Sequence, residues 1–150
     1  MTTKSLAAKP SVVRIPVKAK DIMQHPVISA TPRASLRDIA SQILKYEFNA
    51  LPVAEPEGKV LGVISEADIV FSLIDGPRLE NVVAANFMTS PPVTVDVGTS
   101  TEEVMRTLHE HRIVRVPVTE EGKLVGIISR RDVIRAVLEP EFIAFGEVWE

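Results

Sequence analysis

The sequence contains no cysteine, which excludes a disulfide framework and any zinc site built on thiolates. Glycine is scarce, at 7 of 150 residues, and leaves little material for a glycine-rich phosphate cradle. One tryptophan and one tyrosine offer few rings on which single-stranded bases could stack. The formal net charge of −3 also disfavours a general nucleic-acid binder, for which a basic face is expected.

Long hydrophobic runs are missing as well. No stretch approaches the length needed to span a bilayer, and residues 1–20 contain no apolar run typical of a secretory signal. With the absence of cysteine, this predicts a cytoplasmic protein without membrane contact. Hydrophobic residues still make up 45% of the chain and charged residues 25%, which suits a soluble chain of one compact domain or two small ones.

Signatures of catalysis and of metal binding are absent from the sequence. It has no Gly-x-Ser-x-Gly elbow, no phosphate loop and no Gly-x-Gly-x-x-Gly. The only histidines are His25, His109 and His111, and the last two would point to different faces of a helix. We therefore expect no catalytic residues, no metal site and no resident cofactor.

What the chain does contain is an internal repeat with an offset of 65 and then 64 positions. The matched positions are Met23 with Met88, Pro26 with Pro91, Ser35 with Ser100, Pro52-Val53 with Pro117-Val118, Gly62 with Gly126, Ile64-Ser65 with Ile128-Ser129, and Asp68 with Asp132. They define two units, residues 18–74 and 83–138. Residues 75–82, which include Gly76-Pro77, are predicted to form the linker.

Each unit has the pattern of β-α-β-β-α. Short β-like runs at 27–30 and 93–95 precede amphipathic helices that Ser35 and Ser100 are expected to cap. Hairpins follow, 50–54 with 60–64 and 115–119 with 124–128, and a second helix starts after Ser65 or Ser129. In the first amphipathic helix the expected buried face comprises Leu36, Ile39, Ala40, Ile43 and Leu44; in the second it comprises Val104 and Leu108, with Met105 beside them.

This pattern predicts an α+β fold in which each unit has a three-stranded sheet with helices on one side. A unit of this size buries little apolar surface alone, so we expect the two to pack by their sheet faces with pseudo-twofold symmetry. The cleft between them is then the natural ligand site.

Each unit also places a hydroxyl and a carboxylate three residues apart at the mouth of its second helix: Ser65 with Asp68, and Ser129 with Asp132. Free backbone N–H groups and the helix dipole favour an anion such as phosphate there, and an ionised aspartate can accept two hydrogen bonds from a ribose diol. The alternative is a plain capping box. One side chain can do both, so both interpretations stay open.

Three recurring phrases carry a family resemblance: Gly62–Ile69 with Gly126–Val133, Met23–Pro26 with Met88–Pro91, and Leu51–Val53 with Val116–Val118. On these phrases, residues 18–138 resemble a pair of CBS domains, the Bateman module. The resemblance implies a regulatory module that binds AMP, ADP, ATP or a related adenosyl ligand between its repeats, without catalysis. It also implies a homodimer. Because no effector domain is attached to the two repeats, we expect any regulated partner to be a separate protein.

The resemblance further implies the site residues. Asp68 and Asp132 match the ribose-binding aspartates of the family, and Ser65 and Ser129 match the adjacent hydroxyls. In that family the adenine often lies against the opposite repeat, at the end of its first strand and just before its Pro-Val phrase. Carried over, the Asp132 site is completed by Ala30, Thr31, Asn49 and Ala50, and the Asp68 site by Val95, Asp96, Val114 and Arg115.

The two sites are expected to differ, because charge near them differs. The second repeat has Arg115, Arg130 and Arg131 where the first has Ala50, Glu66 and Ala67. Arginine is the better phosphate partner, with Arg131 and Arg115 as the candidates, so we predict tighter nucleotide binding at Asp132 than at Asp68. The alternative is that Arg130 and Arg131 form a solvated face beside Glu120 and Glu121.

The ends and the competing functions remain. Residues 1–17 are expected to form a mobile arm, or to add a strand at 12–15. Residues 139–150 are rich in apolar side chains and are expected to cover a helix or, as we favour, to form a dimer contact. The second hypothesis for the whole chain is a ligand-free dimerisation or scaffold module. A third hypothesis, nucleic-acid binding through Lys18, Lys20, Arg130 and Arg131, is disfavoured by the net charge of −3.

Overall fold

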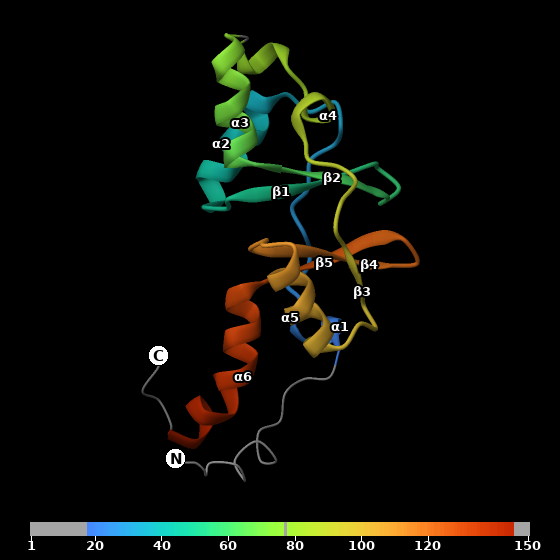
Figure 1. Cartoon of the computed structure of the whole chain (residues 1–150), viewed down its shortest axis with the longest axis vertical. Helices are drawn as coiled ribbons and strands as arrows, with labels where there is room; N and C mark the ends of the chain where they lie inside the picture. Colours follow the sequence, from blue (N-terminus) through green and yellow to red (C-terminus); the bar gives the residue numbers. More distant parts are fainter. Residues whose placement is uncertain (1–17, 77, 146–150) are drawn as a thin grey trace.

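The computed structural model describes residues 18–76 and 78–145, with only the backbone of 139–145. The predicted N-terminal arm and residues 146–150 of the predicted apolar tail lie outside these residues. Figure 1 shows two small α+β units stacked with their sheets facing each other. The elements in chain order are α1 (Ala19–Ile22), α2 (Leu36–Tyr46), β1 (Ala50–Ala54), β2 (Val60–Ser65), α3 (Glu66–Ser72), η2 (Leu73–Asp75), η3 (Leu79–Asn81), α4 (Ala84–Phe87), β3 (Val95–Asp96), α5 (Thr101–Glu110), β4 (Arg115–Glu120), β5 (Lys123–Ser129) and α6 (Arg130–Phe145).

Both predicted hairpins are present. β1 pairs antiparallel with β2, and β4 pairs antiparallel with β5. An extra residue interrupts the register at the same place in each, between Val53 and Ala54 and between Val118 and Thr119. The expectation of three strands per sheet is confirmed for the second repeat, where β3 runs parallel to β4. In the first repeat the initial strand is reduced to one parallel bridge, Ala30 to Val53.

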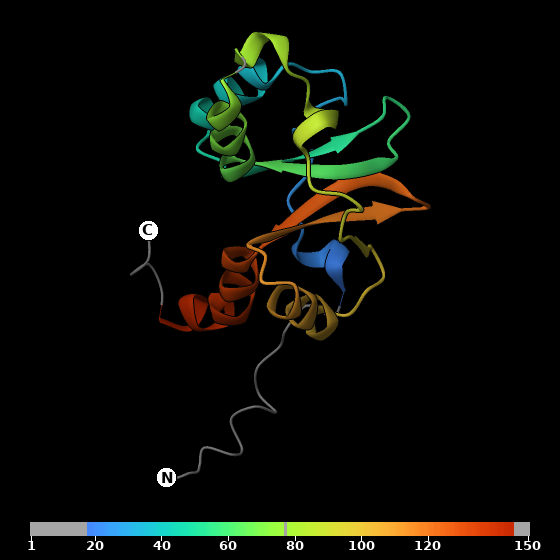
Figure 2. The ribbon, with the colours of Figure 1, turned by 45° about the horizontal axis from the view of Figure 1, so that its top comes forward.

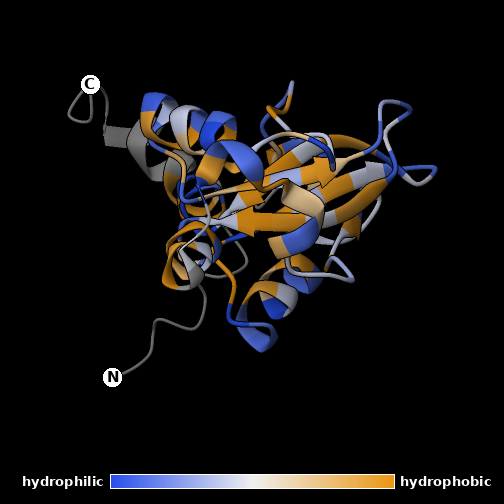
Figure 3. Ribbon diagram, turned by 90° about the horizontal axis from the view of Figure 1, so that it is seen from above, coloured by the Kyte–Doolittle hydropathy of each residue, from blue (hydrophilic) through white to orange (hydrophobic). Residues whose placement is uncertain are grey.

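The two sheets lie back to back between outer layers of helices, as the turned view in Figure 2 shows. The strands are apolar on both faces, which Figure 3 displays as mostly hydrophobic ribbon. Because successive strand side chains alternate, Leu51 and Val53 pack under α2 and α3, while Pro52 faces the seam between the sheets. The seam is therefore walled by apolar side chains, and each repeat keeps its own core on the helical side.

The amphipathic helices begin where their caps predict. The Oγ atoms of Ser35 and Ser100 accept hydrogen bonds from N–H groups of the first turn, each at 3.1 Å. Leu36, Ile39 and Ile43 are buried as expected. The assignment of Leu44 to the same face is wrong: its side chain is 76% exposed, because it lies past the edge of the buried stripe and no described element covers it.

The segment that opens each repeat in the sequence packs on the other repeat. The amide of Ala19 in α1 donates to the carbonyl of Thr99 at 2.7 Å, and the amide of Ala84 in α4 donates to the carbonyl of Ala34 at 2.9 Å. Ala19 belongs to the core of the second repeat, whereas Ala84 belongs to that of the first. The connections between the repeats therefore cross over, with pseudo-twofold symmetry.

Glycine makes this crossing possible. Met88 and the backbone of Thr89 lie directly over Gly62, where a Cβ atom would stand 2.6 Å from the Thr89 carbonyl oxygen. Met23 lies in the same way over Gly126. A residue without a side chain is needed wherever another segment approaches a strand this closely. The methionine and the glycine that recur in both repeats thus contact each other, Met88 on Gly62 and Met23 on Gly126.

Candidate functional site

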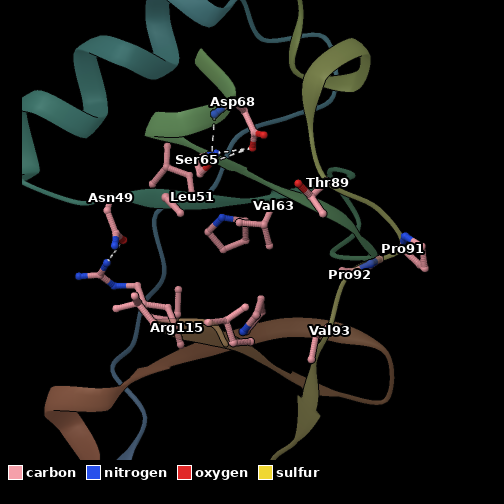
Figure 4. A pocket seen from close by; sticks show the side chains of 16 residues that line it. Asn49, Leu51, Val63, Ser65, Asp68, Thr89, Pro91, Pro92, Val93 and Arg115 are labelled. Carbon is pink, nitrogen blue, oxygen red and sulfur yellow. Dashed lines mark hydrogen bonds between the residues drawn. The ribbon is translucent and has the colours of Figure 1, made fainter. Parts of the chain in front are cut away.

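The larger of two facing cavities in the seam has a volume of about 300 Å³ and lies beside Ser65 and Asp68. Figure 4 shows these two residues on the first-repeat side, Arg115 reaching from the second repeat at one end, and Pro91 and Pro92 at the other. The remaining lining residues, nearly all apolar, are Asn49, Ala50, Leu51, Pro52, Val63, Thr89, Val93, Ile113, Val114, Pro117 and Ile127. Apolar walls with a few polar groups are typical of small-molecule sites.

Ser65 and Asp68 form a reciprocal cap at the start of α3. The Oδ2 atom of Asp68 accepts from the Ser65 amide at 2.8 Å and from its hydroxyl at 2.9 Å, while the Asp68 amide donates to the Ser65 Oγ at 3.1 Å. The capping interpretation is therefore confirmed. It leaves the other carboxylate oxygen, Oδ1, without a donor among residues 18–76 and 78–145, so the same side chain keeps acceptor capacity toward the cavity.

The helix mouths offer fewer amides than the sequence suggested. In α3 the Glu66 amide donates to the Asn49 carbonyl at 3.0 Å, and in α6 the Arg130 amide donates to the Val114 carbonyl at 3.0 Å. The amides of Asp68 and Asp132 are held by their serines. The expectation of a free first turn is wrong for these groups, because each helix follows a strand whose neighbour supplies an acceptor.

Arg115 is the cation placed at this seam. Its Nη1 atom donates to the Asn49 Oδ1 across the repeats, and its guanidinium lies 5.6 Å from the centre of the Phe48 ring. The side chain lines both seam cavities. It can therefore present a fixed positive charge to an anionic group in either one.

The second cavity, beside Ser129 and Asp132, is smaller, at about 120 Å³. Here the capping geometry recurs, with the Ser129 amide 2.8 Å and the hydroxyl 3.0 Å from the Asp132 Oδ2. The Oδ1 atom also accepts hydrogen bonds, from the side-chain Nε2 of Gln24 at 2.6 Å and from the Arg135 Nη1 at 3.0 Å. Asp132 is only 4% exposed.

The structure brings together some of the predicted site residues and not others. Ser65, Asp68, Asn49, Val114, Arg115 and Ala50 line the larger cavity, and Ser129, Asp132, Arg115 and Ala50 line the smaller one. Ala30, Thr31, Val95, Asp96 and Arg131 line neither.

Two of the displaced residues, Ala30 and Val95, have a common cause. The first strands turn into the repeat cores where they bridge β1 and β4, so Ala30 is 5% and Val95 7% exposed. The cavity walls come from earlier residues, 26–28 and 91–93, which sequence reasoning missed. The repeated Pro26 and Pro91 were the available signal. Arg131 is exposed on α6, away from both cavities.

Metal binding and membrane spanning find no support in the described part of the chain. Among the side chains that the structure describes, no group of three or more acidic or histidine side chains is arranged to hold a metal ion. Over the same residues, no helix combines the length and the hydrophobicity that crossing a bilayer requires.

Two equivalent half-folds with facing Ser-x-x-Asp helix starts define the class of tandem regulatory repeats. The CBS domain matches this chain twice, over residues 19–75 and 83–139, so the chain belongs to the CBS-domain family and forms a CBS pair. The α+β fold with tandem repeats, expected from the sequence, is confirmed.

Solved CBS structures are similar to this chain over most of its length. CBSX2 of Arabidopsis thaliana, in complex with AMP, is 27% identical with a TM-score of 0.73, and the match covers 84% of this chain and 99% of that one. A CBS domain pair in complex with 5-methylthioadenosine and S-adenosyl-L-methionine is 27% identical with a TM-score of 0.71, covering 81% and 95%.

A curated relative points to the same family. Hypoxic response protein 1 of Mycobacterium tuberculosis is 27% identical over 128 residues, which are 85% of this chain and 90% of that protein. Its crystal structure, with two coordinated zinc ions, has a TM-score of 0.73 to this chain, with 28% identity and coverage of 79% and 97%. The chain spans 65% of the length of another relative, from Methanopyrus kandleri.

Proposed function

We propose that this CBS pair is a regulatory module that binds an adenine nucleotide or a related adenosyl ligand in the seam between its repeats, without catalysing a reaction. Its setting is the cytoplasm and its regulated partner is a separate protein. Binding of the ligand would shift the relative position of the repeats and so the affinity for that partner.

The observation that carries this proposal is the cavity beside Asp68. Its proline and valine walls suit a flat heterocyclic base, and the unengaged Oδ1 atom of Asp68 suits a ribose diol. Arg115 at the end of the cavity suits a phosphate. AMP in CBSX2 and the adenosyl ligands of the other CBS pair support the same ligand class.

Calorimetric titration with AMP, ADP, ATP and S-adenosyl-L-methionine tests the proposal, with thermal shift as a second readout. We expect binding of at least one of them and its loss in Asp68→Asn, which keeps an oxygen for the cap. The matched control is Asp38→Asn, in the first turn of α2 and in neither seam cavity. No binding of any of these ligands would contradict the proposal.

We also propose that the chain forms a homodimer through the outer faces of its helices. Such a dimer favours the second candidate function, a ligand-free scaffold. Large apolar side chains are exposed there: Leu44 by 76%, Val70 by 63%, Ile74 by 73% and Ile134 by 57%. Exposed apolar patches of this kind mark interaction surfaces. Sedimentation of the full chain tests this, and a monomer at micromolar concentration would contradict it.

The charges beside this face suit one arrangement of two copies. One groove is lined by two acidic side chains, Glu47 and Glu66, against one basic side chain, Arg115; the other is lined by two basic side chains, Arg112 and Arg130, against one acidic side chain, Glu110. Glu47 and Arg112 occupy equivalent positions of the repeat, as do Glu66 and Arg130. A twofold dimer in which the first repeat of one copy faces the second repeat of the other pairs opposite charges twice.

A further inference from the structure

The two seam cavities are related by pseudo-symmetry but differ in volume, about 300 Å³ beside Asp68 and about 120 Å³ beside Asp132. Side chains at equivalent lining positions account for the difference. The second cavity has Gln24, Ile28 and Phe48, and the first has the smaller Thr89, Val93 and Ile113 at the same positions, in that order.

The backbone confirms that these positions are equivalent. Gln24 forms an antiparallel bridge with Ile127 next to the second cavity, and Thr89 forms the same bridge with Val63 next to the first. The side chain of residue 24 is therefore aimed as that of residue 89 is, and the exchange of glutamine for threonine alters only its reach.

The length of the side chain at this position decides whether the aspartate of the site can accept a hydrogen bond from a ligand. The side-chain Nε2 of Gln24 donates to the Asp132 Oδ1 at 2.6 Å, and Nη1 of Arg135, three residues after Asp132, donates to the same atom at 3.0 Å. The residue three after Asp68 is Phe71, which is 61% exposed and donates nothing. Both oxygens of Asp132 thus accept hydrogen bonds from within the chain, whereas one oxygen of Asp68 has no donor in the part of the chain that the structure describes.

We infer that Gln24, Phe48 and Arg135 close the second site, so that each chain takes one nucleotide, beside Asp68. A ligand at Asp132 would have to displace two hydrogen bonds to a carboxylate, each of which lowers affinity on the order of tenfold. This inference rests on the proposed function. It reverses the order of affinities that the arginines of the second repeat predicted.

An exchange of residues between the sites tests the inference by calorimetric titration with AMP. The opened variant carries Gln24→Thr, Phe48→Ile and Arg135→Phe. The closed variant carries the reciprocal exchanges at two of these three positions, Thr89→Gln and Ile113→Phe, and thermal melting verifies that both variants fold. We expect one AMP per wild-type chain, two per opened variant, and a loss of affinity of at least about tenfold in the closed variant.

The outcomes separate this inference from the proposed function. The closure would be overturned if the wild-type chain bound two molecules of AMP, if one AMP still bound to Asp68→Asn, or if the opened variant bound only one. None of these three results would contradict the proposal that the chain binds a nucleotide. Absence of binding of AMP, ADP, ATP and S-adenosyl-L-methionine by both the wild-type chain and the opened variant would overturn both.

Discussion

Arg115 of the second repeat donates a hydrogen bond from Nη1 to Oδ1 of Asn49 in the first, and so ties the two repeats together across the seam. The bond holds the guanidinium over the Phe48 ring and at the edge of both cavities. A cation fixed in this way needs little reorganisation to meet a phosphate.

Arg115→Ala is therefore expected to weaken AMP binding by about 2 kcal/mol, roughly thirtyfold, since hydrogen bonds to charged groups are of this size. Adenosine, which lacks the phosphate, should bind the variant and the wild-type chain about equally. Calorimetry with both ligands measures the difference. Equal losses for AMP and adenosine would show that Arg115 shapes the cavity without contacting a phosphate.

Ser65→Ala is expected to lower both stability and affinity, because Ser65 caps α3 and lines the cavity. The loss of a cap costs about 1 kcal/mol in the free energy of unfolding. Ser35→Ala is the matched control, since Ser35 caps α2 and lines neither seam cavity. Ser35→Ala should lose a similar amount of stability in urea unfolding and keep its affinity for AMP. If Ser35→Ala lost as much affinity for AMP as Ser65→Ala, the effect of Ser65 on binding would be due to helix capping alone.

Gly62→Ala should destabilise the chain more than Gly126→Ala. A Cβ at Gly62 would stand 2.6 Å from the carbonyl oxygen of Thr89, which is backbone, whereas its nearest neighbours at Gly126 would be side-chain atoms of Met23, with Sδ at 2.3 Å and Cγ at 2.8 Å. Overpacking of this kind costs about 1–3 kcal/mol, and a thioether can rotate away. Unfolding in urea gives the two values, and a larger loss in Gly126→Ala would contradict the close approach at Thr89.

Reversal of charge at the helical grooves tests the arrangement of the dimer. Glu47→Arg alone should weaken self-association by on the order of tenfold, because it would face Arg112 of the second copy. Addition of Arg112→Glu should restore it, since the exchanged pair is again complementary. Sedimentation at low and moderate salt measures both. If the double variant associates no better than the single one, the first repeats do not face the second.

Much of this fold could be predicted from the chain because the signals were local and occurred twice. The caps at Ser35 and Ser100, the two hairpins and the order of elements all depend on side chains within a few residues of one another. The match of Met23 with Met88 identified the repeat. It did not show that each methionine packs on a glycine of the other repeat, since that contact depends on how the chain crosses between units.

The site was less predictable, because it depends on long-range contacts. Arginines near Asp132 in the sequence suggested an open, basic site, yet the hydrogen bond that fills it comes from Gln24, 108 residues away. Similarly, Ala30 and Val95 lie in the expected first strands, but their side chains are buried in the cores. Neither the hydrogen bond from Gln24 nor the burial of Ala30 and Val95 can be inferred from periodicity or composition, because both depend on how the two repeats pack together.

The crossed connections make the pair, and not the single repeat, the smallest folding unit of this chain. A fragment that began at α4 would leave behind α1 and Met23, which complete its core, and would carry a helix with no surface to dock on. Each half thus acts as an intramolecular scaffold for its twin. If the chain were divided between the repeats, we expect the two fragments to fold only when they associate with each other.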